Sequence, residues 1–432
     1  MMNHYPEYKP SGVEWLGEVP THWQIKKAGW YLSAEKGSRA SELTKEYCGQ
    51  NEGEFPVYSG QTGNSGVMAK IDSHEFDFGN EGVLFSTTVG AKAMHLSHIK
   101  GKFSLSQNCM IIHSPSDALF TRFYYYHLDP LFKYERGLIP DHMQASFRME
   151  DLYEYKFALP DLMEQKAIAH FLDLETARID NLISEKESFI QLLQEKRQVL
   201  ISHVVTKGLV DNVKMKPSGV EWIGEIPEHW VCNRLKQNLS ETMMYGANEA
   251  ALDSNLSHPR YIRITDMMNN GELKKDSYKS LSPELAKPYL LKDGDVLLAR
   301  SGATVGKAFI YRDKFGESCF AGYLIKASVN RAKLVPQFLY YITQSKFYWD
   351  YIGNSQITAT IQNVSAEKYG NMYLPLPEIS EQESIVGYLD IQLSKFKLLE
   401  QETKSSIELL KEHRTALISA AVTGKIDVRE VA

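Results

Sequence analysis

EQKAIAHFLDLETARIDNLISEKESFIQLLQEKRQVLIS, residues 164–202, carries a hydrophobic pattern that returns without a gap at residues 381–419, 217 positions later. In each copy every seventh position belongs to a column that is apolar except at its third member. The columns are Leu172, Ile179, Lys186, Leu193, Leu200 and Leu389, Phe396, Thr403, Leu410, Leu417. Nearby apolar residues widen each column to a stripe on one helix face: Ile168, Leu182, Phe189 and Ile385, Leu399, Ile407. The pattern favours two long helices packed together as a spacer over two unrelated surface helices.

Both predicted helices have recognisable ends. Each follows a Leu-Pro pair, at 159–160 and 376–377, and each stops just before a glycine, Gly208 or Gly424. In the second copy Ser380 and Glu383 fit a capping box. At a rise of ~1.5 Å per residue, each helix is expected to be 55 to 60 Å long.

A second repeat, which we call the frame motif, reads KPSGVEWLGEVPTHW at 9–23 and KPSGVEWIGEIPEHW at 216–230, with twelve of fifteen positions identical. The chain therefore runs frame motif, globular segment, helix, and then the same series again. Because the second frame motif directly follows the first helix, the first frame motif is expected to lie near the end of the second helix. We predict a first globular domain at 1–158, a first helix at 159–211, a second globular domain at 212–375 and a second helix at 376–432.

The two globular segments have diverged in sequence but keep a common plan. Residues 82–86 and 294–300 each resemble a buried strand, followed by a glycine-containing turn and a second strand at 93–96 or 308–311. Aromatic helices are expected at 120–128 and 336–347. We therefore expect an α/β (α+β) protein with two similar globular domains, separated by two antiparallel helices packed as a coiled coil, and a pseudo-twofold internal repeat.

Composition limits the class of protein. With 43% hydrophobic residues the chain can build real cores, and no apolar run approaches the ~20 residues of a membrane span, so a cytoplasmic protein is expected. The four cysteines are isolated, which indicates neither a zinc site nor a disulfide framework. The net charge of −6 argues against a nucleic-acid partner. However, residues 212–375 hold twenty basic and sixteen acidic residues, so the second globular domain by itself is basic.

Four sequence features together resemble the specificity subunit of type I restriction-modification systems. They are the repeated frame motif, the Leu-Pro-x-x-x-Glu-Gln helix entries at 159–165 and 376–382, YIRITD at 261–266 and GDVLLARSG at 294–302. The resemblance covers nearly the whole chain in the family's order. It implies two target-recognition domains, each reading one half of a split DNA site and held apart by the helices.

The resemblance also implies partners. The subunit is expected to bind double-stranded DNA, to assemble with two DNA-adenine methyltransferase subunits along the helices, and to join restriction-translocase subunits in the full complex. One departure concerns the first half, which has no Arg-x-Thr-Asp sequence and carries PVYSGQTGNSG at 56–66 instead. The two halves are therefore expected to read different bases, so the DNA site should be asymmetric.

Candidate DNA contacts are polar side chains that can reach base edges, close to glycines that let backbone amides approach phosphates. For any one of them, a purely structural role in a turn is the alternative, and Asp266 could instead orient Arg263. The candidates in the first half are Ser59, Gln61, Thr62, Asn64, Ser65, Thr87, Thr88 and Lys92. Those in the second half are Arg263, Thr265, Asp266, Arg300, Ser301, Thr304, Lys307, Gln356, Thr358, Thr360 and Gln362.

Enzyme-like patterns are weak. GATVGKA at 302–308 is one residue too short for a phosphate loop and lacks its Ser or Thr. Asp141, Glu154 and Lys156 have the residue types of a metal-dependent nuclease, but the repeat does not preserve them. No motif for binding a methyl donor is present. We therefore expect no catalytic residue, metal or cofactor. A nuclease that uses those three residues and a protein-interaction scaffold without base reading remain as alternatives.

Overall fold

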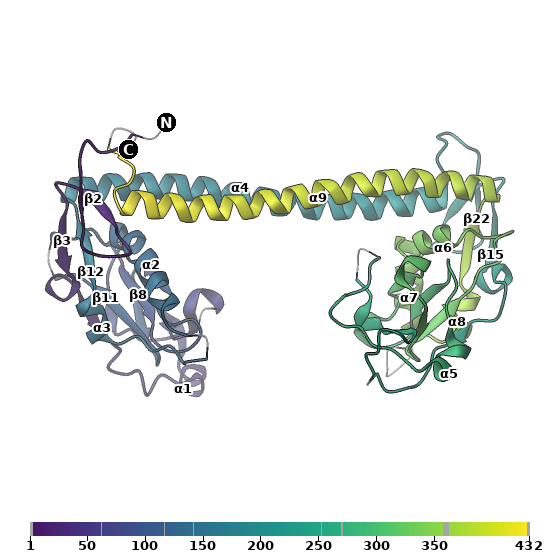
Figure 1. Cartoon of the computed structure of the whole chain (residues 1–432), viewed down its shortest axis with the longest axis horizontal. Helices are drawn as coiled ribbons and strands as arrows, with labels where there is room; N and C mark the ends of the chain where they lie inside the picture. The colour runs from purple at the N-terminus through teal and green to yellow at the C-terminus, as the bar shows by residue number, and fades with distance from the viewer. Residues whose placement is uncertain are drawn as a thin grey trace. The chain divides into compact units, whose positions relative to one another are not determined.

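The computed structural model describes residues 3–61, 63–115, 117–140, 142–251, 253–268, 271–356 and 363–429. The chain forms two compact units (Figure 1): unit 1 is Met1–Lys186 with Ser405–Ala432, and unit 2 is Glu187–Lys404. Each unit contains one globular half of mixed α/β structure and about half of each long helix, which confirms the predicted fold class. Because the units divide both helices, the four-domain division made from the sequence remains a prediction.

The two long helices are α4 (Leu162–Lys207) and α9 (Ile379–Val422). They have 46 and 44 residues, or roughly 65 to 70 Å at 1.5 Å per residue, and are longer than predicted. The capping box was wrong, because α9 begins at Ile379 and Ser380 therefore lies within its first turn. In α4, the Asp161 carboxylate accepts a hydrogen bond from the Glu164 N–H at 2.9 Å and caps the helix.

The helices run antiparallel within each unit. In unit 1 the start of α4 (Ile168, Leu172) shares a hydrophobic core with the end of α9 (Leu417, Val422). In unit 2 the end of α4 and the start of α9 share a second core, to which Ile201, Val205, Ile385 and Leu389 belong. The stripe therefore packs helix on helix, and in the described part of the chain no helix is both long and apolar enough to cross a membrane.

Three of the six residues predicted to widen the stripe are buried, namely Ile168, Ile385 and Ile407, and the other three are exposed. Leu182, Phe189 and Leu399, which lie three positions after a column residue, are exposed by 38%, 43% and 41%. Thr176 and Ile407, which lie four positions after a column residue, are buried at 4% and 5% exposure, and the Thr176 hydroxyl lies 3.2 Å from Tyr126 Oη of the globular half. Two side chains four residues apart are separated by about 40° around the helix, so the buried face alternates between steps of three and four.

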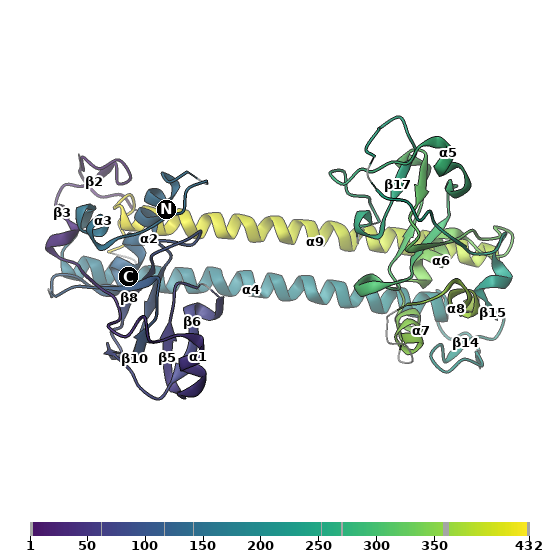
Figure 2. The same ribbon diagram turned by 90° about the horizontal axis from the view of Figure 1, so that it is seen from below.

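The globular half of unit 1 contains two four-stranded sheets with strand orders β6-β5-β10-β7 and β4-β11-β8-β9. Helix α2 packs against the second sheet, and Figure 2 shows β5, β6, β10 and α1 together on one side of the unit. The strands are β4 (Ser33–Glu35), β5 (Glu52–Tyr58), β6 (Val67–Ile71), β7 (Phe76–Asp77), β8 (Val83–Thr87), β9 (Leu96–Ile99), β10 (Lys102–Leu105) and β11 (Cys109–His113). The helices are α1 (Lys45–Gln50), α2 (Thr121–Gly137) and α3 (Met149–Glu154).

Two predicted elements of unit 1 have other bounds. The second strand, β9, begins at Leu96 and not at residue 93, because Met94 has a positive φ of 66° in the turn that follows β8. Helix α2 continues nine residues beyond its predicted end at 128, and Pro130 lies inside it.

The globular half of unit 2 has one four-stranded sheet, β16-β21-β18-β19, and a parallel pair, β17-β20. The predicted helix at 336–347 is two helices, because Ser345 begins the second one by accepting a hydrogen bond from the Tyr348 N–H at 3.4 Å. The strands are β16 (Met244–Tyr245), β17 (Arg260–Ile262), β18 (Val296–Ala299), β19 (Ala308–Ile310), β20 (Ser318–Phe320) and β21 (Leu324–Ala327). The helices are α5 (Pro283–Ala286), α6 (Pro336–Ile342), α7 (Lys346–Gln356) and α8 (Ala366–Asn371).

The frame motif occupies the same place in each unit. It forms a small hairpin, β1 (Tyr8–Pro10) with β2 (Glu18–Pro20) or β13 (Met215–Pro217) with β14 (Glu225–Pro227). Its histidine then contacts the first turn of a long helix, with 2.9 Å between His22 Nε2 and Glu164 Oε2 and 2.9 Å between His229 Nε2 and Glu381 Oε2. The chain next enters the globular half along β3 (Gln24–Lys27) or β15 (Val231–Arg234), and leaves it along the antiparallel neighbour β12 (Lys156–Leu159) or β22 (Tyr373–Leu376).

Residues 3–4 and 425–427 meet in unit 1, which brings the first frame motif to the end of the second helix. Asn3 and Asp427 form an antiparallel bridge, and His4 Nδ1 lies 2.9 Å from the Lys425 carbonyl oxygen. Gly424 has a φ of 72°, and a Cβ there would lie 2.3 Å from Pro20 Cδ. The frame motif therefore packs directly on the glycine that follows α9, which confirms the expectation.

One buried histidine in unit 1 joins three elements. In α2, His127 Nδ1 lies 2.9 Å from the Val422 carbonyl oxygen, and His127 Nε2 accepts a hydrogen bond from the Ala158 N–H at 3.1 Å. These partners require a neutral ring with the proton on Nδ1. Burial lowers the pKa of His127 from its ordinary value of 6.5 to about 4.

Acid is therefore expected to destabilise unit 1 through His127. The unfolded chain takes up a proton below about pH 6.5 and the folded chain only near pH 4, so this contribution is complete above pH 6.5 and falls by roughly 3 kcal/mol between these values. Urea unfolding followed between pH 4 and 8 should show a shallower acid dependence for His127→Ile than for the wild type. Unit 2 has Ile342 in the corresponding place, next to Tyr341 as His127 is next to Tyr126. Equal acid dependence of the two proteins would show that His127 does not titrate in this way.

Candidate nucleic-acid interface

Arg263 and Asp266, two of the predicted contacts of unit 2, are joined by several hydrogen bonds. The Asp266 carboxylate is 1% exposed and accepts hydrogen bonds from Arg263 Nε at 2.9 Å and Nη2 at 2.7 Å. It also accepts one from the Arg263 backbone N–H, and the Ser277 carbonyl oxygen accepts another from Nη2. The carboxylate raises the pKa of Arg263, and this fork fixes the plane of a guanidinium whose side chain is still 28% exposed.

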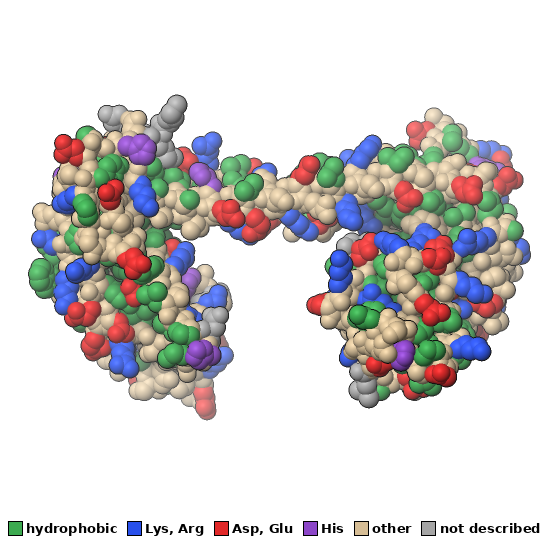
Figure 3. Space-filling view, viewed as in Figure 1, with side chains coloured by type: hydrophobic (Ala, Val, Ile, Leu, Met, Phe, Trp, Pro, Cys, Tyr) green, Lys and Arg blue, Asp and Glu red, His purple; other side chains and the backbone are tan. Residues whose placement is uncertain are grey.

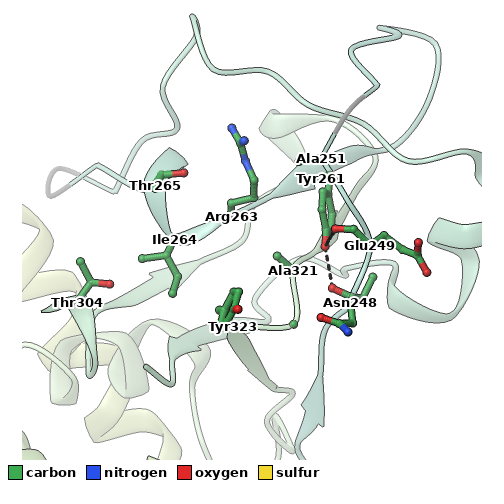
Figure 4. A pocket seen from close by; sticks show the side chains of 12 residues that line it. Asn248, Glu249, Ala251, Tyr261, Arg263, Ile264, Thr265, Thr304, Ala321 and Tyr323 are labelled. Carbon is green, nitrogen blue, oxygen red and sulfur yellow. Dashed lines mark hydrogen bonds between the residues drawn. The ribbon is translucent and has the colours of Figure 1, made fainter. Parts of the chain in front are cut away.

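Arg263 lies at the rim of a pocket of about 390 Å³. Side chains from segments 247–251, 261–265 and 321–323, with Thr304, line it. In Figure 4 the Arg263 side chain rises on the side away from Tyr323, and Thr265 lies beside it. Tyr323 is 65% exposed, whereas Tyr261 is buried and donates its hydroxyl hydrogen to the Ala247 carbonyl oxygen at 2.7 Å. The pocket thus combines an apolar floor with a rim that carries both the Arg263 guanidinium and the Glu249 carboxylate (Figure 4), an arrangement that suits the edge or face of a nucleobase.

Some of the other predicted contacts of unit 2 are exposed, and others are partly buried or bonded to the protein itself. Thr265 and Thr304 are exposed at the pocket, and the Arg300 guanidinium lies over the Tyr245 ring, 4.7 Å from its centroid. Ser301 is half-buried and bridges to Asn363.

Lys307 is directed inward. Its ammonium donates to the Met267 carbonyl oxygen at 2.6 Å, and burial lowers its pKa. The structure thus favours a structural role for Lys307. Thr358, Thr360, Gln362 and the side chain of Gln356 lie outside the described residues.

In unit 1 the predicted loop 59–66 is closed by its own hydrogen bonds. The Ser59 N–H donates to the Gly66 carbonyl oxygen at 3.0 Å, and Gln61 Nε2 donates to the Val67 carbonyl oxygen at 2.9 Å. Ser65 has a positive φ of 53° in the turn between them. Ser59 is 9% exposed and Gln61 is exposed, while Thr62 and the side chain of Asn64 lie outside the described residues.

Thr87 and Thr88 are buried, at 0% and 4% exposure. The Thr87 hydroxyl donates to the Lys92 carbonyl oxygen and accepts from the His95 N–H, so it closes the turn between β8 and β9. The Thr88 backbone bonds to Asn108 and Phe147. For these two threonines the structure favours the role in a turn over direct contact with DNA, whereas Lys92 is exposed in the same turn.

Sequence reasoning missed the floor and far wall of the unit 2 pocket. Segments 247–251 and 321–323 are distant in the chain and meet because the Gly322 N–H donates to the Ala247 carbonyl oxygen at 2.7 Å. Neither segment carries a motif, so the only available signal was the isolated Gly-Tyr pair after β20.

The nuclease alternative finds no support. Glu154 is paired with Lys27, whose Nζ lies 2.8 Å from its carboxylate, and Asp141 lies outside the described residues. Among the residues that the structure describes, no three His, Cys, Asp or Glu side chains are grouped to hold a metal ion.

Comparisons with known proteins identify the class. The profile of the type I restriction modification DNA specificity domain matches residues 34–188 and 236–409. The chain is 22% identical to the type I restriction enzyme MjaVIII specificity subunit of Methanocaldococcus jannaschii over 96% of this chain and 95% of that protein. It is 24% identical to the EcoBI specificity subunit of Escherichia coli, over 62% of this chain and 58% of that protein.

Solved structures share the fold. A chain from a study of complex assembly and conformational transition of the type I R-M system superposes with a TM-score of 0.71, at 14% identity, over 94% of this chain and 98% of that one. The HsdS subunit from Thermoanaerobacter tengcongensis gives 0.54 at 15% identity, with the same coverage. The fold and the matched domains define a non-catalytic DNA-recognition subunit. The chain belongs to the family of type I restriction-modification specificity subunits.

Proposed function

We propose that the globular half of each unit reads one half of an asymmetric, bipartite double-stranded DNA site. The observation that carries this proposal is that the two units repeat their frame contacts and differ in their polar surfaces. Unit 1 carries the self-bonded loop 59–66, whereas unit 2 carries the Arg263–Asp266 fork beside an apolar pocket. Unlike surfaces of this kind favour contact with unlike bases.

In unit 2 we assign the base contact chiefly to Arg263, with Thr265 and Thr304 at the same pocket. Asp266 is buried and acts through Arg263 by fixing its plane. Nε and Nη2 already donate to Asp266 and Ser277, so Nη1 is the group left to donate to a guanine edge or a phosphate. Because its plane is fixed, the side chain loses little conformational freedom when it binds.

The helices are proposed to dock two DNA-adenine methyltransferase subunits and to set the distance between the half-sites. Restriction-translocase subunits would join the same complex, and the protein would act in the cytoplasm, where its DNA target is. Support comes from apolar side chains that stay exposed along both helices among the charged ones (Figure 3). They include Leu174, Leu182, Phe189, Leu192 and Val199 on α4, and Tyr388, Ile391, Leu398, Leu399 and Leu409 on α9.

A gel-shift series with duplex DNA, with and without the methyltransferase subunits, tests this function. Sequence-specific binding that needs both half-sites is expected, and binding that ignores base sequence would favour a scaffold. Arg263→Ala is expected to weaken specific binding by about 1–3 kcal/mol and to leave binding to unrelated DNA nearly unchanged.

Two further variants control for stability and for charge. Arg263→Lys keeps the charge but loses the fork, so it should also lose specificity. Arg331→Ala removes an arginine of unit 2 that is 65% exposed and pairs with Asp293. If Arg331→Ala reduced specific binding as much as Arg263→Ala did, the assignment to Arg263 would be wrong.

A further inference from the structure

A buried glutamine attaches each globular half to the first turn of its long helix. In unit 1, Gln165 is 0% exposed, and its Oε1 accepts a hydrogen bond from the Phe120 N–H at 2.8 Å. Its Nε2 donates to the carbonyl oxygens of Ala118 at 2.9 Å and Pro160 at 3.0 Å. All three partners are backbone groups just before α2 or just before α4.

Unit 2 repeats this arrangement. Gln382 is also 0% exposed, and its Oε1 accepts from the Val335 N–H at 2.8 Å. Its Nε2 donates to the carbonyl oxygens of Lys333 at 3.0 Å and Pro377 at 2.9 Å. The two halves have diverged in sequence, yet the same side chain makes the same three contacts. An amide is suited to this place because it carries donors and an acceptor together.

A second attachment lies two helical turns further on. In unit 1 the Asp173 carboxylate of α4 accepts hydrogen bonds from Tyr126 Oη at 2.7 Å and Arg122 Nε at 2.6 Å, both on α2. In unit 2 the Asp390 carboxylate of α9 accepts one from Tyr341 Oη on α6. Each aspartate follows its glutamine by eight residues, or roughly 12 Å along the helix.

We propose that two pairs of positioning residues, Gln165 with Asp173 and Gln382 with Asp390, fix the orientation of each globular half on its helix. By fixing this orientation they select the length of the spacer in the DNA site. A half held at one point can rotate about that point, whereas two points about 12 Å apart prevent the rotation. This inference rests on the proposed reading of two half-sites. Adding one base pair to the spacer moves a half-site by about 3.4 Å and turns it by about 34°. A protein whose globular halves have a fixed orientation therefore binds best to one spacer length.

The test measures the affinity of the assembled methyltransferase complex for duplexes with fixed half-sites and spacers from two base pairs too short to two too long. The wild type is expected to lose about tenfold or more in affinity for each base pair of error, because the DNA must twist to fit. Asp390→Ala removes the outer attachment of unit 2. It is expected to accept spacers one base pair off with a loss below about threefold, while base changes within either half-site remain as harmful as in the wild type.

Matched variants separate positioning from folding. Asp390→Asn keeps an oxygen that can accept the Tyr341 hydroxyl hydrogen and should restore the wild-type spacer profile. Glu412→Ala removes an exposed carboxylate of α9 and should leave that profile unchanged. Asp173→Ala should relax the spacer in the same way from unit 1.

If Asp390→Ala kept the spacer profile of the wild type, Asp390 would not fix the orientation of its globular half and the inference would fail. If Asp390→Ala lowered the affinity for every spacer by the same factor, the residue would only stabilise the fold and the inference would fail. If wild-type binding ignored the bases of one half-site, the proposed function itself would fail, whatever the variants do.

Discussion

Replacement of residues 24–158 with the corresponding segment of another specificity subunit is expected to change the bases read in one half-site and to leave the other half-site as it was. The structure supports such an exchange because the segment enters along β3 and leaves along β12, and these strands pair with Gln24 opposite Leu159. The two ends of the segment are therefore neighbours, and the replacement needs no new connection.

The attachment to the helix also favours exchange. Gln165 lies outside the segment and bonds to the backbone of Ala118 and Phe120, so a foreign segment can supply the same groups with other side chains. Each mismatched base pair costs roughly 1–3 kcal/mol, so several mismatches should reduce binding to the old half-site to the non-specific level.

Methylome sequencing of a host that carries the hybrid subunit and its methyltransferase would measure this result. The reciprocal exchange of residues 231–375, which begin on β15 and end on β22, is the control and should change only the other half-site. A change in both half-sites after either exchange would contradict modular reading.

Insertion of one heptad into each long helix is the second large effect that we expect. The insertions would follow Lys186 in α4 and Lys404 in α9, where the chain passes from one compact unit to the other. Seven residues add about 10 Å of helix, so the preferred spacer should become longer. The bases read should not change, because neither globular half is altered.

The phase of the buried stripe provides the control for this experiment. Seven residues preserve the repeat of the stripe, whereas five would turn the following apolar face by about 140° away from its partner. The five-residue variant should therefore lose stability and DNA binding together. Methylation of a library with randomised spacers would compare the proteins, and an unchanged spacer in the heptad variant would rule out the helices as the measure of distance.

The two long helices and the two frame motifs could be predicted from the sequence because each occurs twice in the chain. The columns through Leu172 and Leu389, the repeated frame motif and the glycines after each helix all indicated the elements that the structure contains. Predictions at element ends were weaker. The predicted capping box at Ser380 was wrong because a Ser-x-x-Glu spacing also fits within the first turn of a helix. Strand β9 starts later than predicted because Met94 has a left-handed conformation, which is not expected for a methionine.

The candidate site could be predicted only in part. YIRITD led to Arg263 and Thr265 at the pocket, but residue type could not distinguish them from Lys307 or Thr87, which bond inward to carbonyl oxygens. A polar side chain near a glycine serves a turn or a ligand equally well, and the choice depends on which backbone groups the fold brings within about 3 Å.

The sequence by itself determined the duplication, the two long helices and the family, because a repeated periodicity and a repeated motif are local properties of the chain. Only the tertiary structure decided that Asp266 holds Arg263, that Tyr323 faces a pocket with residues 247–251, and that Gln165 and Gln382 attach the globular halves. The reason is physical. These contacts join residues that are close only after the sheets and helices have packed, and most of their partners are backbone groups, which are the same in every sequence.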